Sequence, residues 1–403
     1  MEIIERPAYL HHIISHLGKG MMIILVGQRR VGKSFMLKQL QSWLQANRSA
    51  ANVVYVNKEL HAFKDIATAD DLYGYATAHL PEGGDNYLLI DEVQDITGYE
   101  DALRSLHAEN CCQIVATGSN AYIFSSELST RLSGRYVEIP IHSLTYRGFL
   151  RFHGLEDTDK SLLAYLRVGG LPGLCHYDIE DESQVRDYLQ GVYNTIMLRD
   201  VIARDEIRNV TFIENLAVFV ADNIGKLISV RNITNTMKSH GEKVSEMLTS
   251  TYLRYLCGAF IITPVQRYDI HGRRIFEQNN KFYFADHGLR NLLCGFNLRG
   301  SIEKVMENVI HHHLVTQGFK VTVGILRNGE VDFVAVRDER RLYVQAVYLL
   351  GSEETVAREF GNLRAIRDNY PKYVVSMDPV SGGLPEYPGI IHIHLREFLM
   401  TDF

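Results

Sequence analysis

The sequence predicts an α/β protein whose first third forms a parallel β-sheet. Apolar runs without polar alternation, typical of strands buried on both faces, occur at 21–26 and 87–90. Each run is followed by residues that are suited to ligand binding or catalysis. Gly27 opens a glycine-containing loop after the first run, and Asp91 and Glu92 follow the second. Parallel sheets bind ligands at the carboxyl ends of their strands, so these residues are expected to share one site.

The composition is that of a globular protein. The chain has 403 residues, 46% hydrophobic and 22% charged, which corresponds to roughly two to four domains. Its net charge of -6 argues against a general polyanion binder, so any nucleic-acid contact needs a local basic face. The five cysteines show no metal-binding or redox spacing. No apolar run is long enough to span a bilayer, and residues 1–7 do not resemble a signal peptide. We therefore expect a cytoplasmic protein without a membrane partner.

The loop after the first strand has the pattern G-x-x-x-x-G-K-S and precedes a helix predicted from Lys33 to about Trp43. This is the pattern of a phosphate-binding P-loop, whose backbone N–H groups and helix N-terminus surround phosphate oxygens. Lys33 would neutralise the terminal phosphates, and the Ser34 hydroxyl would bind Mg²⁺. A simple glycine turn is disfavoured because all four fixed positions match. The predicted nucleotide-binding residues are Gly27, Gln28, Arg29, Arg30, Val31, Gly32, Lys33, Ser34 and Phe35.

Two acidic residues end the strand predicted at 87–90, after a buried strand at 52–57 and a helix at 70–80. Asp91 suits the magnesium shell, and Glu92 suits orienting and polarising the attacking water. Two acids at a solvated strand end are the simpler alternative, which the upstream phosphate loop disfavours.

The fourth strand, 113–117, also ends in polar residues. Asn120, and after it Ser119, is expected to sense the terminal phosphate, although either residue could equally cap the next helix. Arg131 and Arg135 precede a fifth strand and are candidates to stabilise the transferred phosphate in cis or in a neighbouring subunit of a homo-oligomer. For both arginines, a surface ion pair is an equal alternative. The predicted catalytic residues are Glu92, Lys33, Asn120, Arg131 and Arg135, and the predicted metal ligands are Ser34 and Asp91.

The stretches 27–34, 88–94, 117–120 and 132–135 together resemble the AAA+-type P-loop ATPases of bacteria and archaea, in which an AAA domain precedes a C-terminal domain of unknown function. The resemblance runs over nearly the whole chain and is strongest at the phosphate loop and the acidic pair. It implies an AAA+-like core with ATP and Mg²⁺ as cofactors. A guanine-reading motif at 57–60 is incomplete, since Leu60 stands where a carboxylate is needed.

The middle of the chain is predicted to be helical and then mixed. Helical patterns between 146 and 208 indicate a small lid, or plain helical packing. Three helices and two strands then follow in the order of a winged helix-turn-helix, a module that contacts either DNA or protein. The third helix and the wing loop would offer the polar residues Lys243, Ser245, Thr249, Arg254, His271, Arg273 and Arg274.

The last third, from about Ile302, has an order of helices and strands that resembles the restriction-endonuclease-like fold. Glu307 and Asp332 stand at two of its metal-binding positions, whereas Gln345 and Val347 replace the glutamate and the lysine. Magnesium is normally held by carboxylates, so we predict that this domain does not cut DNA. The consecutive histidines 311–313 point in different directions on a helix and are read as ordinary helix residues.

We therefore expect an ATP-binding, AAA+-like ATPase that couples Mg-ATP binding and hydrolysis to movement of an interaction module for DNA or protein. The alternatives are an ATP-gated nuclease and a non-enzymatic, nucleotide-responsive regulator. The four expected domains are an AAA+-like P-loop core (1–145), a helical lid (146–208), a winged-helix-like domain (209–298) and a degenerate restriction-endonuclease-like α/β domain (299–403).

Overall fold

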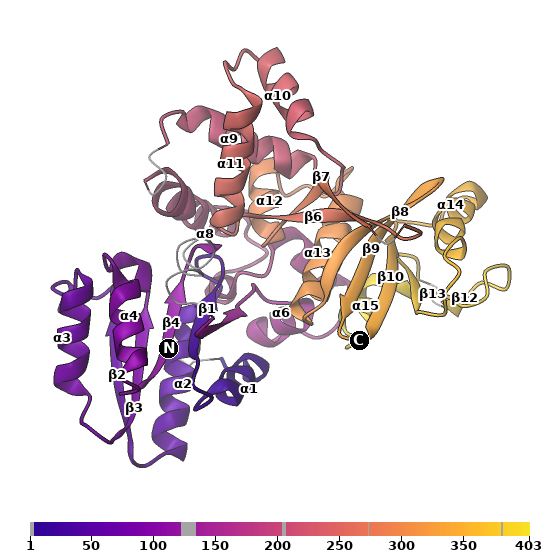
Figure 1. The fold of residues 1–403 in the computed structure, drawn as a ribbon. Helices are drawn as coiled ribbons and strands as arrows, with labels where there is room; N and C mark the ends of the chain where they lie inside the picture. The colour runs from indigo at the N-terminus through magenta and orange to yellow at the C-terminus, as the bar shows by residue number, and fades with distance from the viewer. Residues whose placement is uncertain (1–3, 122–133, 204–206, 273, 380–381) are drawn as a thin grey trace. The chain divides into compact units, whose positions relative to one another are not determined.

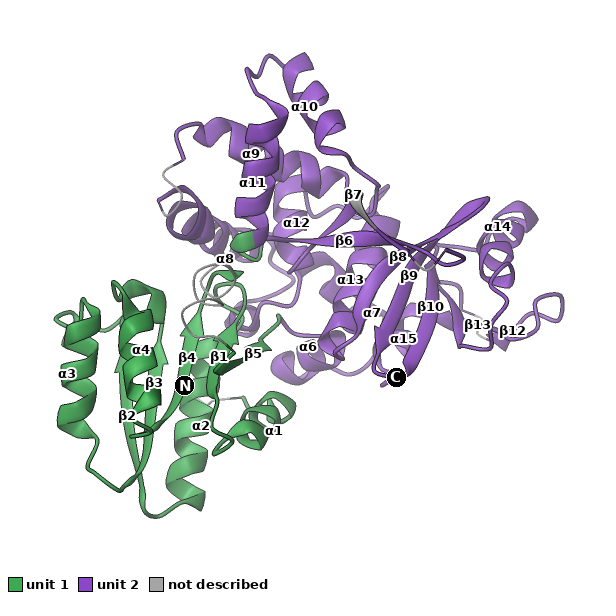
Figure 2. Cartoon of the chain, in the orientation of Figure 1, with its two compact units in different colours: residues 1–142, 258–260 green, residues 143–257, 261–403 purple. Residues whose placement is uncertain are grey.

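Five segments of the chain are described by the computed structural model (Figure 1). They are residues 4–121, 134–203, 207–272, 274–379 and 382–403. The chain divides into two compact units (Figure 2). Unit 1 comprises Met1–His142 and Gly258–Phe260, and unit 2 comprises Ser143–Cys257 and Ile261–Phe403.

Unit 1 is built on a sheet of five described strands, and every neighbouring pair of them is parallel. Their spatial order is β2 (Ala51–Asn57), β3 (Asp85–Asp91), β4 (Gln113–Gly118), β1 (Met22–Val26) and β5 (Tyr136–Pro140). The described helices are α1 (Pro7–His16), α2 (Lys33–Asn47), α3 (Ala69–His79) and α4 (Tyr99–Ala108), with short turns η1 (His61–Phe63) and η2 (Val93–Asp95). The predicted parallel α/β core is confirmed.

The sequence explains this sheet. All five residues of β1 are buried, as expected for a strand covered on both faces. Helix α2 packs against β2, β3 and β4, while α4 packs against β4. Helix α3 starts with a capping box, in which Thr68 and Asp71 bond each other's backbone N–H groups. With β1 between β4 and β5, the carboxyl ends of β1 and β3 lie on either side of the end of β4.

Unit 2 begins with helices and continues with the three helices and the hairpin predicted as winged-helix-like. The helical elements up to residue 203 are α6 (Tyr146–His153), α7 (Asp159–Val168), η4 (Pro172–His176), α8 (Glu182–Thr195) and η5 (Ile196–Ile202). The next elements are α9 (Val210–Asp222), α10 (Val230–Ser239), α11 (Glu246–Gly258), β6 (Ile262–Asp269), β7 (Arg274–Phe284) and α12 (His287–Cys294). Three helices followed by two strands is the predicted order, whereas α12 was not predicted, and the winged-helix assignment stays a prediction.

The described strands of unit 2 form one eight-stranded sheet in the order β12-β13-β11-β10-β9-β8-β6-β7. The remaining elements are α13 (Ile302–Thr316), β8 (Lys320–Leu326), β9 (Gly329–Arg337), β10 (Arg340–Ala346), α14 (Glu353–Arg364), β11 (Lys372–Ser376), β12 (Gly382–Gly383), β13 (Ile390–His394) and α15 (Leu395–Leu399). Strand β6 pairs in parallel with β8. The sheet therefore contains strands from both sides of residue 298, where the predicted winged-helix-like domain ends. The four-domain division and the nuclease-like fold stay predictions.

Candidate nucleotide-binding site

The phosphate loop leaves β1 at Gly27, where only glycine fits. The backbone of Gly27 has a φ of 149°, and a Cβ atom there would lie 2.2 Å from the carbonyl oxygen of Ile141. At the other end of the loop, Gly32 caps α2 in a left-handed conformation with a φ of 102°. Helix α2 begins at Lys33, as predicted, and its first N–H groups therefore face the loop.

Lys33 is 4% exposed and lies within the loop. Its Nζ donates hydrogen bonds to the carbonyl oxygens of Gly27 (2.8 Å) and Gln28 (3.0 Å). The side-chain amide of Gln28 in turn donates to the carbonyl oxygen of Phe260, 2.9 Å away in the same unit. The loop thus concentrates positive charge and N–H groups at the carboxyl end of β1, which is the chemistry that phosphate oxygens require.

Asp91 is fully buried at the end of β3 and accepts three side-chain hydrogen bonds. The Ser34 hydroxyl (3.0 Å) and the Thr117 hydroxyl (2.7 Å) donate to its Oδ1, and the Tyr55 hydroxyl (3.2 Å) donates to its Oδ2. Burial, together with the charge of Asp91, raises the pKa of Tyr55 and keeps it a donor. The structure brings together Ser34 and Asp91, the two predicted metal ligands. Both offer oxygen atoms, the donor type that Mg²⁺ prefers.

Glu92 lies beside Asp91 with its backbone in the left-handed region, at a φ of 57°. Its N–H donates to the Thr117 hydroxyl at 2.8 Å. The carboxylate is 3.6 Å from the Arg29 guanidinium of the phosphate loop, measured from Nη1 to Oε2, and it also accepts a hydrogen bond from the Gln94 amide. Gln94 additionally donates to the Ser119 hydroxyl at 3.2 Å. Glu92 is therefore fixed between the loop and the end of β4.

The other predicted catalytic residues differ in position. Asn120 is 2% exposed and follows β4, next to Ser119. Arg131 lies outside the described residues. Arg135 is exposed, and its carbonyl accepts from the N–H of Met22 at the start of β1. It lies at the amino edge of the sheet, about 17 Å from the loop along a strand of this length. The structure does not bring Arg135 to the phosphate loop of its own chain. This position argues against a role for Arg135 at the nucleotide of its own chain.

Three polar residues of this network were given no role in the sequence analysis: Tyr55, Gln94 and Thr117. Tyr55 lies on β2 and Thr117 on β4, the two strands that flank β3, and Gln94 follows the acidic pair. Their signal in the sequence was a polar side chain at or just beyond the carboxyl end of an apolar strand. Phe35, the last of the predicted nucleotide-binding residues, lies on α2 and is 41% exposed, with the Lys38 ammonium 5.1 Å from its ring centre.

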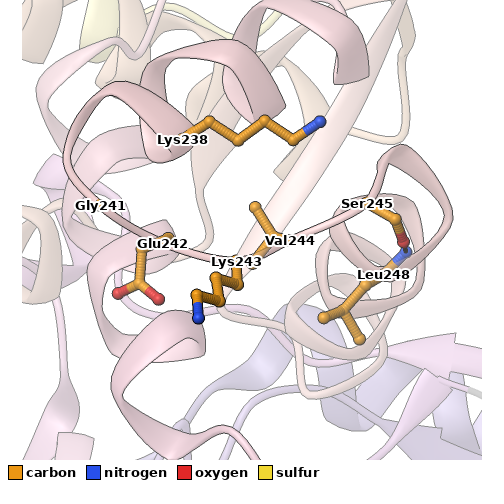
Figure 3. A pocket seen from close by; sticks show the side chains of 7 residues that line it. All are labelled: Lys238, Gly241, Glu242, Lys243, Val244, Ser245 and Leu248. Carbon is orange, nitrogen blue, oxygen red and sulfur yellow. Dashed lines mark hydrogen bonds between the residues drawn. The ribbon is translucent and has the colours of Figure 1, made fainter.

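The polar residues predicted around α11 lie partly elsewhere. Thr249 is fully buried, and its hydroxyl accepts from the Thr234 hydroxyl at 3.0 Å, so it is wrong as a DNA contact. Lys243 and Ser245 precede the helix, whereas Arg254 is exposed on it. Figure 3 shows the open pocket there, about 640 Å³ in volume. It is lined by Lys238, Gly241, Glu242, Lys243, Val244, Ser245 and Leu248. In the wing loop His271 and Arg274 are exposed, and Arg273 lies outside the described residues.

In the C-terminal part, Asp332 and Gln345 are adjacent, because the backbone N–H of Asp332 donates to the side-chain oxygen Oε1 of Gln345 at 3.3 Å. Val347 is buried. The three histidines have separate partners: for example, His311 stacks on the Tyr283 ring with centroids 4.7 Å apart. Among the described residues, no group of three or more His, Cys, Asp or Glu is arranged to hold a metal ion, and no helix is long and apolar enough to cross a membrane.

Comparisons with known proteins agree with this site. Residues 19–150 match a family described as an AAA domain, and residues 159–299 match a domain of unknown function. An uncharacterized protein of Haemophilus influenzae is 32% identical over 380 residues, covering 93% of each chain. Another from Methanocaldococcus jannaschii is 26% identical over 360 residues, covering 86% of this chain and 78% of its own.

Among solved structures, a Walker-type ATPase of Pyrococcus abyssi is similar over 72% of this chain and 96% of its own, at 16% identity and a TM-score of 0.49. The relative from Haemophilus influenzae is similar over nearly the full length of both chains. Together with the AAA match over the phosphate loop and the acidic pair, it settles the family. The chain belongs to the AAA+-type P-loop ATPases, with an AAA domain followed by a domain of unknown function.

Proposed function

We propose that unit 1 binds ATP with Mg²⁺ and hydrolyses it slowly, and that the chain uses this cycle to move an interaction module formed by its winged-helix-like and C-terminal parts. One observation carries the catalytic part of the proposal. Lys33 lies in the loop at the carboxyl end of β1, where the Ser34 hydroxyl donates to Asp91 and the Thr117 hydroxyl connects Asp91 to the backbone of Glu92.

The loop residues have the chemistry for holding phosphate. Lys33 now donates to two loop carbonyls, and these bonds can be exchanged for charge-assisted bonds to phosphate oxygens. The loop amides and the N-terminus of α2 add neutral donors. Ser34 and Asp91 would hold Mg²⁺, which would neutralise charge on the phosphate oxygens. The chain's own part is to keep these two oxygen donors 3.0 Å apart, with Asp91 further fixed by Thr117 and Tyr55.

Glu92 would accept a proton from the attacking water and hold that water toward the terminal phosphate. Its ion pair with Arg29 directs the carboxylate toward the phosphate loop, and Gln94 restrains it from the other side. Gln94 also contacts Ser119, so it is a positioning residue between Glu92 and the end of β4, where Asn120 would sense the terminal phosphate. Arg135 is kept as a residue that would act on the nucleotide of a second copy.

Coupling to the rest of the chain is supported by the contact between Gln28 and Phe260. Gln28 is part of the phosphate loop, and the carbonyl of Phe260 accepts its side-chain amide. Phe260 is only two residues beyond the end of α11, in the short connection to β6. A rearrangement of the loop on binding ATP would therefore shift the backbone at Phe260, next to the end of α11. This helix and the pocket before it belong to the module that we propose to move.

The test compares wild-type protein with Glu92→Gln in ATP binding, single-turnover ATP hydrolysis, and copurification of bound molecules. Hydrolysis that depends on Glu92, together with a client retained by the variant, would support the proposal. ATP binding without any turnover would favour the nucleotide-responsive regulator. Metal-dependent DNA cleavage that is lost in Asp332→Ala would favour the ATP-gated nuclease.

The pocket before α11 favours an anionic partner, of which the DNA backbone is our candidate. Lys238 and Lys243 line it and outnumber its one acid, Glu242. Lys238→Ala with Lys243→Ala should weaken binding of duplex DNA and make it less salt-dependent. Lys320→Ala, which removes an exposed lysine of β8, is the matched control and should bind like wild type. If wild type, the double variant and Lys320→Ala bind duplex DNA equally, the partner of this surface would instead be a protein.

A further inference from the structure

Phe260 has a backbone conformation that a bulky side chain rarely adopts. Helix α11 ends at Gly258, and the N–H of Ile261 donates back to the carbonyl oxygen of Leu256 at 3.0 Å. Within the turn that this bond closes, Phe260 has a φ of 54°, in the left-handed region. Glycine is the usual residue at this point of a helix end, because it has no Cβ atom. With phenylalanine in its place, the turn stores backbone strain.

The phosphate loop contacts this strained residue. The Gln28 amide donates to the Phe260 carbonyl, and the other atom of that amide, Oε1, is buried without a hydrogen-bond partner among the described residues. A buried polar atom without a partner costs free energy. The backbone carbonyl of Gln28 is itself bonded to the ammonium of Lys33 at 3.0 Å. Both unfavourable features can therefore be relieved when Lys33 moves to a phosphate and releases the Gln28 backbone.

The connection that contains Phe260 is bonded to Ala285 in unit 2. The chain passes between the units at residues 142–143 and again around 258–260. After Phe260, the carbonyl of Ile261 accepts from the N–H of Ala285 at 3.1 Å. On the other connection, the hydroxyl of Ser143 donates to the carbonyl of Ala285 at 3.3 Å. Within unit 2, both connections are thus bonded to the same residue.

Ala285 stands at the start of α12, a helix whose polar side chains bind other parts of unit 2. Asp286, which follows it, caps α12 and accepts from the N–H of Gly170 at 2.8 Å. Further along the helix, Asn291 donates to two carbonyl oxygens of α7 at 2.8 and 2.9 Å. Arg290 donates to a carbonyl oxygen of α9 at 3.0 Å. A shift of Ala285 would therefore be passed to α7 and α9.

We propose that Phe260 is a conformational switch that reports the occupancy of the phosphate loop to α12. When phosphate takes the ammonium of Lys33, Gln28 releases Phe260, whose backbone leaves the left-handed region. The carbonyl of Ile261 then moves away from Ala285. This inference rests on the proposed binding of ATP and names the residues through which binding reaches unit 2. The alternative is an ordinary helix end that keeps one conformation with and without nucleotide.

The experiment measures hydrogen–deuterium exchange in the full chain, with and without the non-hydrolysable ATP analogue Mg-AMPPNP. In wild type, the N–H of Ala285 loses its acceptor, so peptides covering 283–289 should exchange about fivefold or more faster with the analogue, the lower end of the usual coupling between two sites. Gln28→Ala removes the bond that holds Phe260, so these peptides should exchange fast without the analogue. Gln45→Ala, which removes an exposed glutamine of α2, is the matched control and should respond like wild type.

Two substitutions of Phe260 separate backbone strain from side-chain packing. Phe260→Gly removes the strain, because glycine adopts a positive φ freely. Its turn should keep one conformation, and the analogue should no longer change the exchange. Phe260→Ala also loses the ring but keeps a Cβ atom, so it should retain the response. An equal response of the two variants would overturn the proposal. Because glycine favours this turn, a Phe260→Gly protein that does not fold would also count against it.

Calorimetric titration of the same proteins with Mg-AMPPNP distinguishes the switch from the proposed function. If wild type does not bind the analogue, the proposed ATP site is wrong and the switch is wrong with it. If wild type binds the analogue but the exchange of 283–289 does not change, only the switch is wrong. Slow exchange in Gln28→Ala without the analogue would also overturn the switch, since Gln28 would then not hold Phe260.

Discussion

Replacing Glu92 by glutamine should separate ATP binding from ATP hydrolysis. The amide fills the same space, but it neither accepts a proton from water nor carries the charge that pairs with Arg29. At 3.6 Å and an effective dielectric constant of about 20, the gross attraction between Arg29 and Glu92 is about 4 to 5 kcal/mol. Desolvation cancels much of it, so we assign about 1 kcal/mol to the net competition of Glu92 with phosphate for Arg29.

Two magnitudes follow from this geometry. Glu92→Gln should bind Mg-ATP as tightly as wild type or up to about fivefold more tightly, because about 1 kcal/mol of competition is removed. The rate of the chemical step should fall by about 10² to 10⁴, the usual contribution of a positioned general base. Calorimetric titration measures the first quantity, and single-turnover phosphate release measures the second. The exposed acid in Glu82→Gln provides the matched control and should change neither. An unchanged single-turnover rate in Glu92→Gln would refute the assignment.

Four further outcomes are expected. Lys33→Ala should weaken Mg-ATP binding about ten- to hundredfold in a calorimetric titration, because one charge-assisted contact is lost; wild-type affinity would contradict the phosphate site. Gly27→Ala should destabilise the protein by about 1 to 3 kcal/mol in urea unfolding, since its Cβ would clash with a backbone carbonyl; an unchanged unfolding midpoint would show that the loop can relax. Arg135→Ala should bind ATP normally and hydrolyse it poorly, with wild-type turnover per subunit rising with protein concentration; concentration-independent turnover by a strict monomer would exclude action in trans. The chain should not cleave plasmid or linear DNA in Mg²⁺ or Mn²⁺, with or without ATP; cleavage that disappears in Asp332→Ala would reverse this reading.

The phosphate site could be predicted because its residues are ordered by a local rule. A parallel strand places whatever follows it at the carboxyl edge, and β1 and β3 are both apolar runs followed by polar residues. Ser34 and Asp91 could therefore be paired although they are far apart in the sequence. The same rule places Arg135, which precedes β5, at the opposite edge. Action in cis, one of the two alternatives left open for Arg135, therefore conflicted with the predicted sheet itself.

The burial of Lys281 on β7, where its Nζ donates to Asp332 at 3.1 Å, could not be predicted, because it depends on packing rather than on local pattern. A single lysine in a strand is usually exposed, and nothing near it in the sequence indicates otherwise. Its partner Asp332 is 51 residues away, on a strand that does not neighbour β7 in the sheet. Thr249 failed for a related reason. Its face of α11 was expected to be open, but α10 covers it through Thr234.

The parallel pairing of β6 with β8 has a consequence for how the chain is made. Arg267 of β6 is in register with Val323 of β8, and the hairpin β6–β7 emerges from the ribosome well before β8 does. Until β8 arrives, one side of β6 exposes unpaired backbone N–H and C=O groups that can pair with another chain. Completion of this sheet is therefore a late event in biosynthesis. A chain ended by proteolysis or truncation near residue 298 would retain that open edge and aggregate, although the phosphate loop and its acidic partners had long been synthesised.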